Sequence, residues 1–424
     1  MASATLGMAT PTLAAAAMTP EQTVAAALKE APIWDGHNDV PEQLRDRRKD
    51  MLAGFDFHNT VNEPLPDKRM AAFFPAGTPT GMQTDLARMK AGHMGAQFWS
   101  VYVSASLPEP EAVEATLQQI DVIKRVVAQY PDEMMLATSS ADVEKAWKAG
   151  KVASLIGMEG GHSIGGSLAV LRQMYALGAR YMTLTHFKTN LIGDSATDAP
   201  KWGGLSPLGK DVVREMQRLG MLVDLSHVAQ KTMLDALDVA QAPVIFSHSG
   251  AQAVSGHPRN VSDEVLDRLK ANGGVVMCNF YPSYVSDAQY KWGAARAGVE
   301  AEQKALHPDR PDLAKAALDA WITAHPKPVA TIGEVADHID HIVKRIGIDH
   351  VGLGGDFDGG SIGLQGMPDV SAYPALLLEL AKRGYSKMDL EKVSSLNTLR
   401  VLKAAEAYAA AHKGDKPIEN PTTF

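Results

Sequence analysis

The chain has 424 residues, of which 45% are hydrophobic and 21% are charged. This is an ordinary globular composition, and the length is compatible with one large α/β barrel that carries insertions. The formal net charge of −8 and the pI near 6.0 argue against nucleic acid as a partner, because phosphate binding needs a basic surface.

The chain contains one cysteine, Cys278, which excludes an intramolecular disulfide. It lies in the apolar run GGVVMCNF, where no neighbouring residue would activate a thiol. We therefore expect a small buried hydrophobic residue at this position rather than a nucleophile.

The first twenty residues are rich in Ala and Thr and carry no charge. They resemble the end of a secretory signal peptide, although the basic segment is missing. We interpret residues 1–25 as a leader or a disordered N-terminal arm, and we favour an exported bacterial protein, periplasmic or secreted, over a cytoplasmic one. Residues 413–424 form a polar C-terminal tail without the hydrophobic segment of a GPI anchor, and no stretch has the roughly 18 apolar residues of a membrane span. We expect no membrane anchor.

Residues 26–412 are predicted to form a single barrel domain. Most of its strand candidates are continuous apolar runs, which are typical of strands buried on both faces. The eight candidates, in chain order, are Ile33–Asp39, Ala96–Val103, Val152–Met158, Arg180–His186, Met221–Ser226, Pro243–His248, Gly274–Phe280 and Val351–Asp356.

Helical patterns lie between these strands, and several of them end at a glycine. Alternating strands and helices predict a parallel sheet, and eight strands predict a closed (β/α)8 barrel of the TIM type. The helical patterns cover Glu111–Gln129, Leu168–Leu177, Leu208–Leu219, Lys231–Ala240, Asp263–Ala271 and Ile332–Ile346.

Two segments depart from the regular alternation. Residues 50–85 are rich in Pro, Phe and Gly and predict a long loop over the first strand. Residues 286–328 predict a helical insertion between strands 7 and 8, on the active-site side of the barrel. A lid, an oligomer contact and an insertion without a function are all compatible with this second segment.

Side chains suited to metal binding or proton transfer recur at the carboxyl ends of the predicted strands, where barrel enzymes place their chemistry. Histidine and carboxylate ligands without matching cysteines favour zinc or a similar divalent ion. His37 and Asp39 are two residues apart, so both can face one ion from one strand. Glu159 has two oxygens and can hold two cations. The full series is His37, Asp39, Glu159, His186, His227, His248 and Asp356.

Asp356 follows two glycines, but GLGGDF lacks the third glycine of a dinucleotide-binding loop, and DFDGG lacks the remaining ligands of a calcium loop. An aspartate at the end of the last strand suits a proton shuttle beside a metal-bound water.

Taken in order, the motifs resemble the renal or membrane dipeptidase family, peptidase family M19 of the amidohydrolase superfamily. The resemblance runs from about residue 33 to about residue 402. It rests on DGHNDVP, GAQFWSVYV, EGGHS, TLTH, DLSH, SHS followed by HPRNV, NFYPSY and VGLGGDFDG.

The resemblance implies a (β/α)8 barrel with two Zn²⁺ ions. His37 and Asp39 would bind one zinc, His227 and His248 would bind the other, and Glu159 would bridge them. The resemblance further implies roles for His186 in contacting substrate and polarising the scissile carbonyl, for Asp356 as general acid and base, and for Arg259 and Tyr284 in binding the substrate's C-terminal end.

Three functions are compatible with these residues. The first is a zinc dipeptidase that hydrolyses small dipeptides, including pairs with a D-residue at the C-terminal position, by attack of a hydroxide that bridges the metals. The second is an amidohydrolase of the same fold that acts on another carboxylate-bearing amide or lactam. The third is a non-catalytic barrel with a biosynthetic or binding role. We expect a small dipeptide as the partner of the site, no nucleic acid, and a homodimer.

Overall fold

Eight parallel strands close into a barrel in the computed structural model, which describes residues 18–65, 81–360 and 363–421. The ring closes because β2 pairs with both β1 and β4, while β9 pairs with both β8 and β1. The short strand β3 pairs only with β4 and stays outside the ring. The strands are β1 Ile33–Asn38, β2 Met94–Tyr102, β3 Met134–Leu136, β4 Val152–Glu159, β5 Ala179–Thr183, β6 Leu222–Asp224, β7 Ile245–Ser249, β8 Val275–Cys278 and β9 Val351–Leu353.

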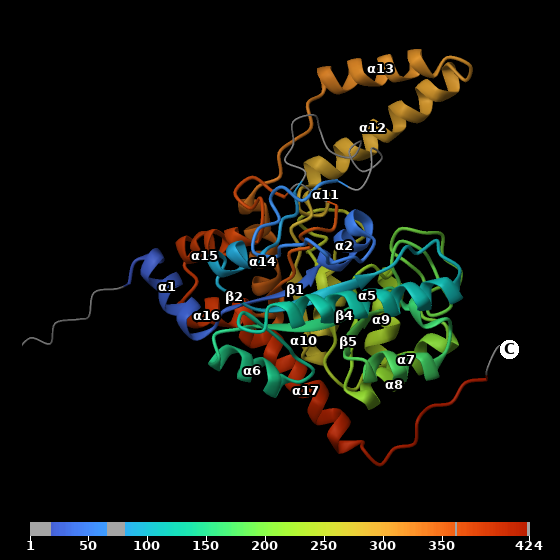
Figure 1. Ribbon diagram of the computed structural model, residues 1–424. Helices are drawn as coiled ribbons and strands as arrows, with labels where there is room; N and C mark the ends of the chain where they lie inside the picture. Colours follow the sequence, from blue (N-terminus) through green and yellow to red (C-terminus); the bar gives the residue numbers. More distant parts are fainter. Residues whose placement is uncertain (1–17, 66–80, 361–362, 422–424) are drawn as a thin grey trace, which may run out of the picture.

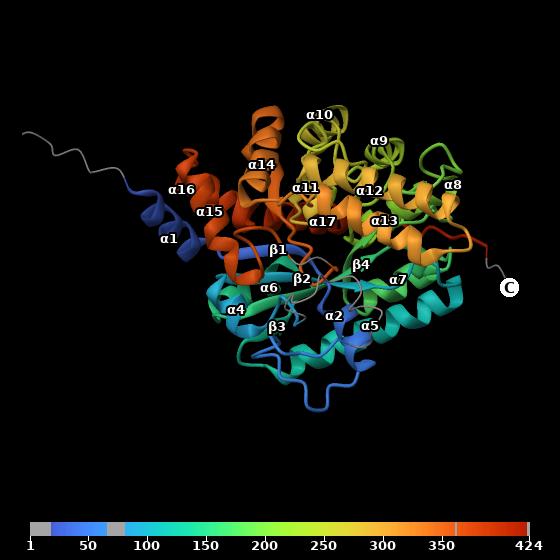
Figure 2. The same ribbon diagram turned by 90° about the horizontal axis from the view of Figure 1, so that it is seen from above.

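Helices surround this barrel, as the two perpendicular views show (Figures 1 and 2). They are α1 Pro20–Glu30, α2 Val40–Arg48, α4 Leu86–Ala91, α5 Glu109–Gln129, α6 Ser140–Lys148, α7 Leu168–Ala176, α8 Pro207–Leu219, α9 Gln230–Val239, α10 Asp263–Asn272, α11 Pro282–Val285, α12 Asp287–Leu306, α13 Pro311–Ala324, α14 Ile332–Ile346, α15 Tyr373–Lys382, α16 Lys387–Glu391 and α17 Asn397–Ala411.

The predicted (β/α)8 barrel is therefore confirmed, and each predicted strand and helix coincides with an observed one. The strand β3 was not predicted, because three residues are too few to show a period. The helices that were also not predicted are α1, α4, α6, α11 and α15–α17. The described parts of residues 50–85 contain no helix or strand, in agreement with the predicted loop.

Side chains alternate between the inside and the outside of the barrel, as expected for strands. On β4, Leu155 belongs to the inner cluster, whereas Ile156 and Met158 belong to the cluster between strands and helices. The inner apolar cluster takes one or two side chains from nearly every strand of the ring: Trp34, Phe98, Leu155, Tyr181, Leu222, Ile245, Val275 and Met277. Towards the carboxyl ends of the strands, the inward positions become polar, with Ser100, Glu159, Thr183, Asp224 and Ser247 all buried.

The predicted helical insertion is also present. Helices α12 and α13 lie between β8 and β9 and form a hairpin that projects away from the barrel (Figure 1). Only Gln289 of α12 is buried, and α13 buries only Ala314 and Leu318. Near its base, the Tyr290 ring lies 4.7 Å from the His257 ring, so the hairpin contacts the loop that follows β7.

The described ends of the chain pack against the barrel domain. Residues 20–25, which we assigned to the N-terminal arm, are the first turns of α1, and residues 1–17 lie outside the described part. In the C-terminal tail, the Ile418 backbone accepts a hydrogen bond from Arg172 and donates one to Glu215, while Asn420 accepts one from the Leu168 N–H. Across the described residues, none of the helices combines the length and apolar character needed to cross a membrane.

Gly157 leaves space inside the barrel for the Tyr181 ring, because a Cβ atom at Gly157 would lie 2.0 Å from that ring. We expect Gly157→Ala to lower the free energy of unfolding by roughly 1–3 kcal/mol, the usual cost of overpacking a core. Urea unfolding measures this loss. Gly298→Ala on the projecting helix α12 is the control, because its Cβ would meet no atom within 4 Å. Equal free energies of unfolding for the two variants would contradict the prediction.

Candidate metal centre and active site

All seven side chains of the predicted series lie at the carboxyl-terminal rim of the barrel and are buried. His37 and Asp39 lie at and just beyond the end of β1. Each of the other five ends or follows a different strand: Glu159 on β4, His186 after β5, His227 after β6, His248 on β7 and Asp356 after β9. The structure therefore brings together residues that are separated by more than 300 positions in the sequence.

The backbone geometry that brings His37 and Asp39 together differs from the one predicted. We expected both on one face of a regular strand, but β1 is irregular between Asp35 and Asn38, and Asp39 is already the first residue of the turn into α2. The two side chains nevertheless meet, with 3.4 Å between His37 Nε2 and Asp39 Oδ2.

Glu159 lies at the centre of the cluster. Its Oε1 atom is 3.4 Å from His37 Nε2, 3.0 Å from His227 Nε2 and 3.4 Å from His248 Nε2. Three groups of described side chains have ligand atoms close enough together to hold an ion, and two of them contain Glu159. One is His37, Asp39 and Glu159, and the other is Glu159, His227 and His248.

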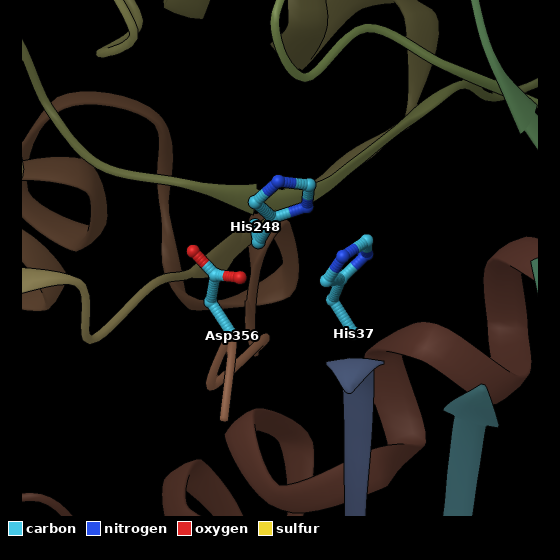
Figure 3. Close-up of side chains that lie close together, drawn as sticks. All are labelled: His37, His248 and Asp356. Carbon is cyan, nitrogen blue, oxygen red and sulfur yellow. The ribbon is translucent and has the colours of Figure 1, made fainter. Parts of the chain in front are cut away.

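A third such group consists of His37, His248 and Asp356, which converge from β1, β7 and the segment after β9 (Figure 3). The His37 and His248 ring centroids are 3.9 Å apart. Asp356 therefore lies within reach of an ion at this centre as well as within reach of a substrate.

The donor set fits divalent metal ions. Three imidazoles and two carboxylates, with no cysteine, form a ligand set that zinc accepts. His37 Nε2 and Asp39 Oδ1 are buried and have no hydrogen-bond partner in the described structure. An unsatisfied buried polar atom is costly, and a bound cation would satisfy both atoms.

The ionisation of three of the four histidines agrees with this fit, whereas the pKa of His37 is raised, because Tyr181 and the carboxylates of Glu159 and Asp39 outweigh the effect of its burial. Burial lowers the pKa of His186, His227 and His248 far below the usual range, and nearby positive charge lowers the pKa of each further. Neutral imidazoles keep the lone pair that a metal ligand needs. Burial also raises the pKa of Glu159 and of Asp356, because isolated carboxylates are unstable away from water.

Backbone strain marks two of these positions. His227 has φ +68° and Asp356 has φ +56°, both in the left-handed region that non-glycine residues rarely adopt. Strained backbone of this kind concentrates at functional sites, where the surrounding structure holds it in place.

A pocket of about 230 Å³ opens over the cluster. His186 lines this pocket. Its ring centroid lies 4.6 Å from that of Tyr102 and 4.0 Å from that of Phe187. Its Nε2 atom lies 3.7 Å from Glu159 Oε1. Tyr284 lines the same pocket. The sequence did not identify several lining residues as functional: Glu42, Gln43, Tyr102, Phe187, Tyr281, Gly359 and Gly360. Tyr102 and Tyr281 belong to the motifs QFWSVYV and NFYPSY, which could have marked them.

Arg259 is fully buried beside this pocket, next to Tyr284, whose ring centroid lies 5.3 Å from the guanidinium. Its hydrogen bonds go to the His248 carbonyl at 3.2 Å and to Ser249 Oγ at 3.5 Å. Within the described part of the chain, no carboxylate forms an ion pair with it. A buried cation without a counterion is costly, so this guanidinium is suited to an anion that arrives with a ligand.

Comparison with known proteins agrees with this arrangement. The family model of the membrane dipeptidases, peptidase family M19, matches residues 21–416. The dipeptidase tcpJ of Claviceps purpurea is 42% identical over 91% of this chain and 79% of its own length. A dipeptidase of Schizosaccharomyces pombe that is described as uncharacterized is 41% identical over 92% and 84%. Both organisms are fungi, so these relatives do not support the bacterial source that we favoured.

Solved structures show the same fold. The crystal structure of the probable dipeptidase PvdM from Pseudomonas aeruginosa matches with a TM-score of 0.76 and 25% identity, over 92% of this chain and 99% of that one. A dipeptidase of family M19, described as a metallopeptidase, matches with a TM-score of 0.67 and 25% identity, over 88% and 98%. The chain belongs to the membrane dipeptidase family, peptidase family M19, and is a metal-dependent dipeptidase.

Proposed function

We propose that this protein hydrolyses small dipeptides with a free C-terminal carboxylate, including L-Xaa-D-Xaa pairs, at a site that holds two Zn²⁺ ions. The observation that carries the proposal is the convergence of three imidazoles and the Asp39 carboxylate on Glu159. This cluster lies close to Arg259, which is buried and has no ion-pair partner among the described residues. The first feature supports metal-assisted hydrolysis, and the second supports a carboxylate-bearing substrate.

His37 and Asp39 would hold one ion, His227 and His248 would hold the other, and Glu159 would contact both. The presence of Glu159 in two of the groups of potential ligands supports this division. Two divalent ions bound here would lower the pKa of a water between them and would polarise the peptide carbonyl.

The remaining residues bind substrate and move protons. Arg259 would orient the dipeptide through its C-terminal carboxylate, and the Tyr284 ring beside it would line the same end of the site. His186, which is fixed between two aromatic rings, would contact the scissile carbonyl. Asp356 would transfer a proton between the attacking water and the leaving amine, for which a raised pKa is an advantage.

The barrel gives the bound dipeptide a direction. Arg259 follows β7, whereas Tyr102 ends β2, and four steps around the eight-strand ring separate these strands in either direction. A dipeptide anchored at Arg259 would therefore extend its N-terminal residue towards Tyr102 and Glu42 on the opposite side of the pocket.

The homodimer that we expected stays a prediction.

The general test is hydrolysis of a dipeptide panel, with L,L and L,D pairs, by protein of defined zinc content. We expect turnover of free dipeptides that disappears when the metal is removed by a chelator and returns when zinc is added. Turnover that is unchanged in metal-free protein would contradict the proposal.

Replacement of Glu159, the ligand shared by both proposed ions, should reduce the number of zinc ions that the site holds. We expect wild-type protein to bind about two zinc ions per chain, as two-metal hydrolases do, and Glu159→Gln to bind fewer. Zinc should also stabilise the wild type by about 2.7 kcal/mol at a concentration 100 times its Kd, but should stabilise the variant less. Elemental analysis and thermal unfolding measure the two effects. Glu42→Gln is the control, because Glu42 lines the pocket but belongs to none of the potential ligand groups.

Asp356→Asn tests the proton shuttle. It keeps the size of the side chain but removes its basicity, so we expect kcat to fall by roughly 10²–10⁴-fold. Zinc content should be largely kept. Asp358→Asn is the matched control, because Asp358 is also buried and also has a positive φ but does not line the pocket. A large loss of zinc in Asp356→Asn would instead make Asp356 a metal ligand, and near wild-type turnover would remove it from the mechanism.

Arg259→Ala tests the carboxylate anchor. A charge-assisted hydrogen bond of this kind is worth about 1.5–3 kcal/mol, so kcat/KM for free dipeptides should fall at least about tenfold. Dipeptides amidated at the C-terminus should be poor substrates of the wild type and should be almost indifferent to the substitution. If the wild type cleaves dipeptide amides as fast as free dipeptides, Arg259 does not bind a carboxylate.

A further inference from the structure

A buried carboxylate that has no part in the proposed mechanism lies directly beneath the metal centre. Asp224, at the end of β6, is fully buried and accepts four hydrogen bonds. The backbone N–H groups of Ser226 and Ser247 donate to Oδ1 at 3.1 and 2.8 Å. The hydroxyl groups of Thr183 and Ser247 donate to Oδ2 at 2.5 and 2.6 Å. Three of the four donors come from the neighbouring strands β5 and β7, and the fourth is the Ser226 N–H just after β6.

Ser247 connects this carboxylate to His248. Its Oγ lies 2.6 Å from Asp224 Oδ2 and 2.8 Å from His248 Nδ1. A hydroxyl group has one hydrogen, and the charged carboxylate oxygen at 2.6 Å attracts it more strongly than either neutral acceptor nearby, His248 Nδ1 at 2.8 Å or Ser226 Oγ at 3.5 Å. The Ser247 oxygen therefore faces Nδ1 as an acceptor, and Nδ1 must carry the proton.

This hydrogen-bond direction determines which nitrogen of His248 is free. With the proton on Nδ1, the lone pair is on Nε2. Nε2 is the atom that lies 3.4 Å from Glu159 Oε1 and 2.9 Å from His227 Nε2, and therefore faces the metal centre.

The three candidate histidine ligands are not oriented alike. His37 Nδ1 lies 2.8 Å from the hydroxyl group of Tyr181, which is a neutral partner. His227 Nδ1 is buried and has no hydrogen-bond partner among the described residues. Only His248 is connected to a carboxylate through a hydroxyl group.

We propose that Asp224 and Ser247 are positioning residues that hold His248 in the tautomer with a free Nε2, and so increase the affinity of the centre for the ion shared by Glu159, His227 and His248. The inference rests on the proposed function, in which His248 is a metal ligand. Neither Asp224 nor Ser247 touches substrate in this arrangement.

The chain offers a matched pair of variants. Ser247→Ala and Thr183→Val each remove one hydroxyl donor from the same oxygen of Asp224, and both residues are fully buried. Only Ser247→Ala also removes the acceptor of His248 Nδ1. A purely structural role predicts similar effects of both variants on zinc affinity, whereas the proposed role predicts an effect of Ser247→Ala alone.

Asp224→Asn provides a second, independent test. Two backbone N–H groups face Oδ1, so the amide oxygen must take that position and the NH₂ group must replace Oδ2. The NH₂ group would then donate to Ser247, and the hydroxyl hydrogen would turn towards His248 Nδ1. This variant keeps the side-chain volume but favours the tautomer with the proton on Nε2.

The experiment measures zinc affinity by competition with a chelator of known affinity, together with urea unfolding of each metal-free protein to confirm folding. We expect Ser247→Ala and Asp224→Asn to bind the zinc ion held by Glu159, His227 and His248 roughly 10–100-fold less tightly than the wild type does. This is the usual effect of losing the partner of a ligand histidine. Thr183→Val should keep wild-type affinity. The same order should appear in the zinc concentration needed to restore dipeptide hydrolysis.

The outcomes separate this inference from the proposed function. If the wild type binds zinc and hydrolyses dipeptides, but Ser247→Ala and Asp224→Asn bind zinc as tightly as Thr183→Val, the positioning role is wrong and the function stands. If folded wild type binds no zinc, the proposed metal centre is wrong, and this inference is wrong with it.

Discussion

The structure of this rim depends on one electrostatic constraint. Asp39, Glu159 and Asp356 are buried close together. Burial, together with the negative charge of the neighbouring carboxylates, raises the pKa of Glu159 and of Asp356. His227 and His248 cannot neutralise this charge, because burial keeps their pKa values low. The pKa of His37 is raised, but one imidazolium can balance only one of the three carboxylates. Cations bound between the carboxylates and the imidazoles would satisfy both sets of groups, so the arrangement of the rim is explained best by metal ions.

The barrel provides the rigidity that such a centre needs. Each candidate ligand is attached to or next to a strand whose lower part packs into the apolar interior, through residues such as Trp34, Leu155 and Leu222. A polar layer lies between this interior and the metal centre, where Tyr181 and Ser247 form hydrogen bonds with His37 and His248, and Asp224 accepts a hydrogen bond from Ser247. The positions of the ligands are therefore fixed by contacts in both the apolar interior and the polar layer of the barrel. The same packing can hold the His227 backbone in its strained left-handed conformation.

The substrate end of the site is constructed differently. Arg259 lies on the loop after β7, and Tyr284 lies on the short helix α11 after β8. The Tyr284 ring stacks on Tyr281 and contacts the tilted ring of His257. His257 in turn contacts Tyr290 at the base of the projecting hairpin. The aromatic contacts join the Arg259 end of the pocket to the insertion, whereas the candidate metal ligands lie at or just beyond the ends of strands. Substrate preference can therefore vary with the loops and the hairpin while the metal chemistry is kept.

The sequence by itself determined the barrel and most of the rim. Strands buried on both faces leave continuous apolar runs, so the eight strands could be recognised, and the rule that barrel sites lie at strand ends predicted the seven side chains that the structure brings together. Family resemblance, rather than the residues alone, indicated Arg259 and Tyr284. The short strand β3 left too little pattern for recognition.

Only the tertiary structure decided contacts between residues distant in sequence. The irregular end of β1 places Asp39 on a turn rather than on the strand, which the spacing of His37 and Asp39 could not reveal. Glu42, Phe187 and Tyr281 become pocket residues because helix α2 and the segments after β5 and β8 meet there. The link from Asp224 through Ser247 to His248 joins two strands at separations below 3 Å. Distances on that scale follow from the closure and register of the barrel, and no local pattern in a single strand encodes them.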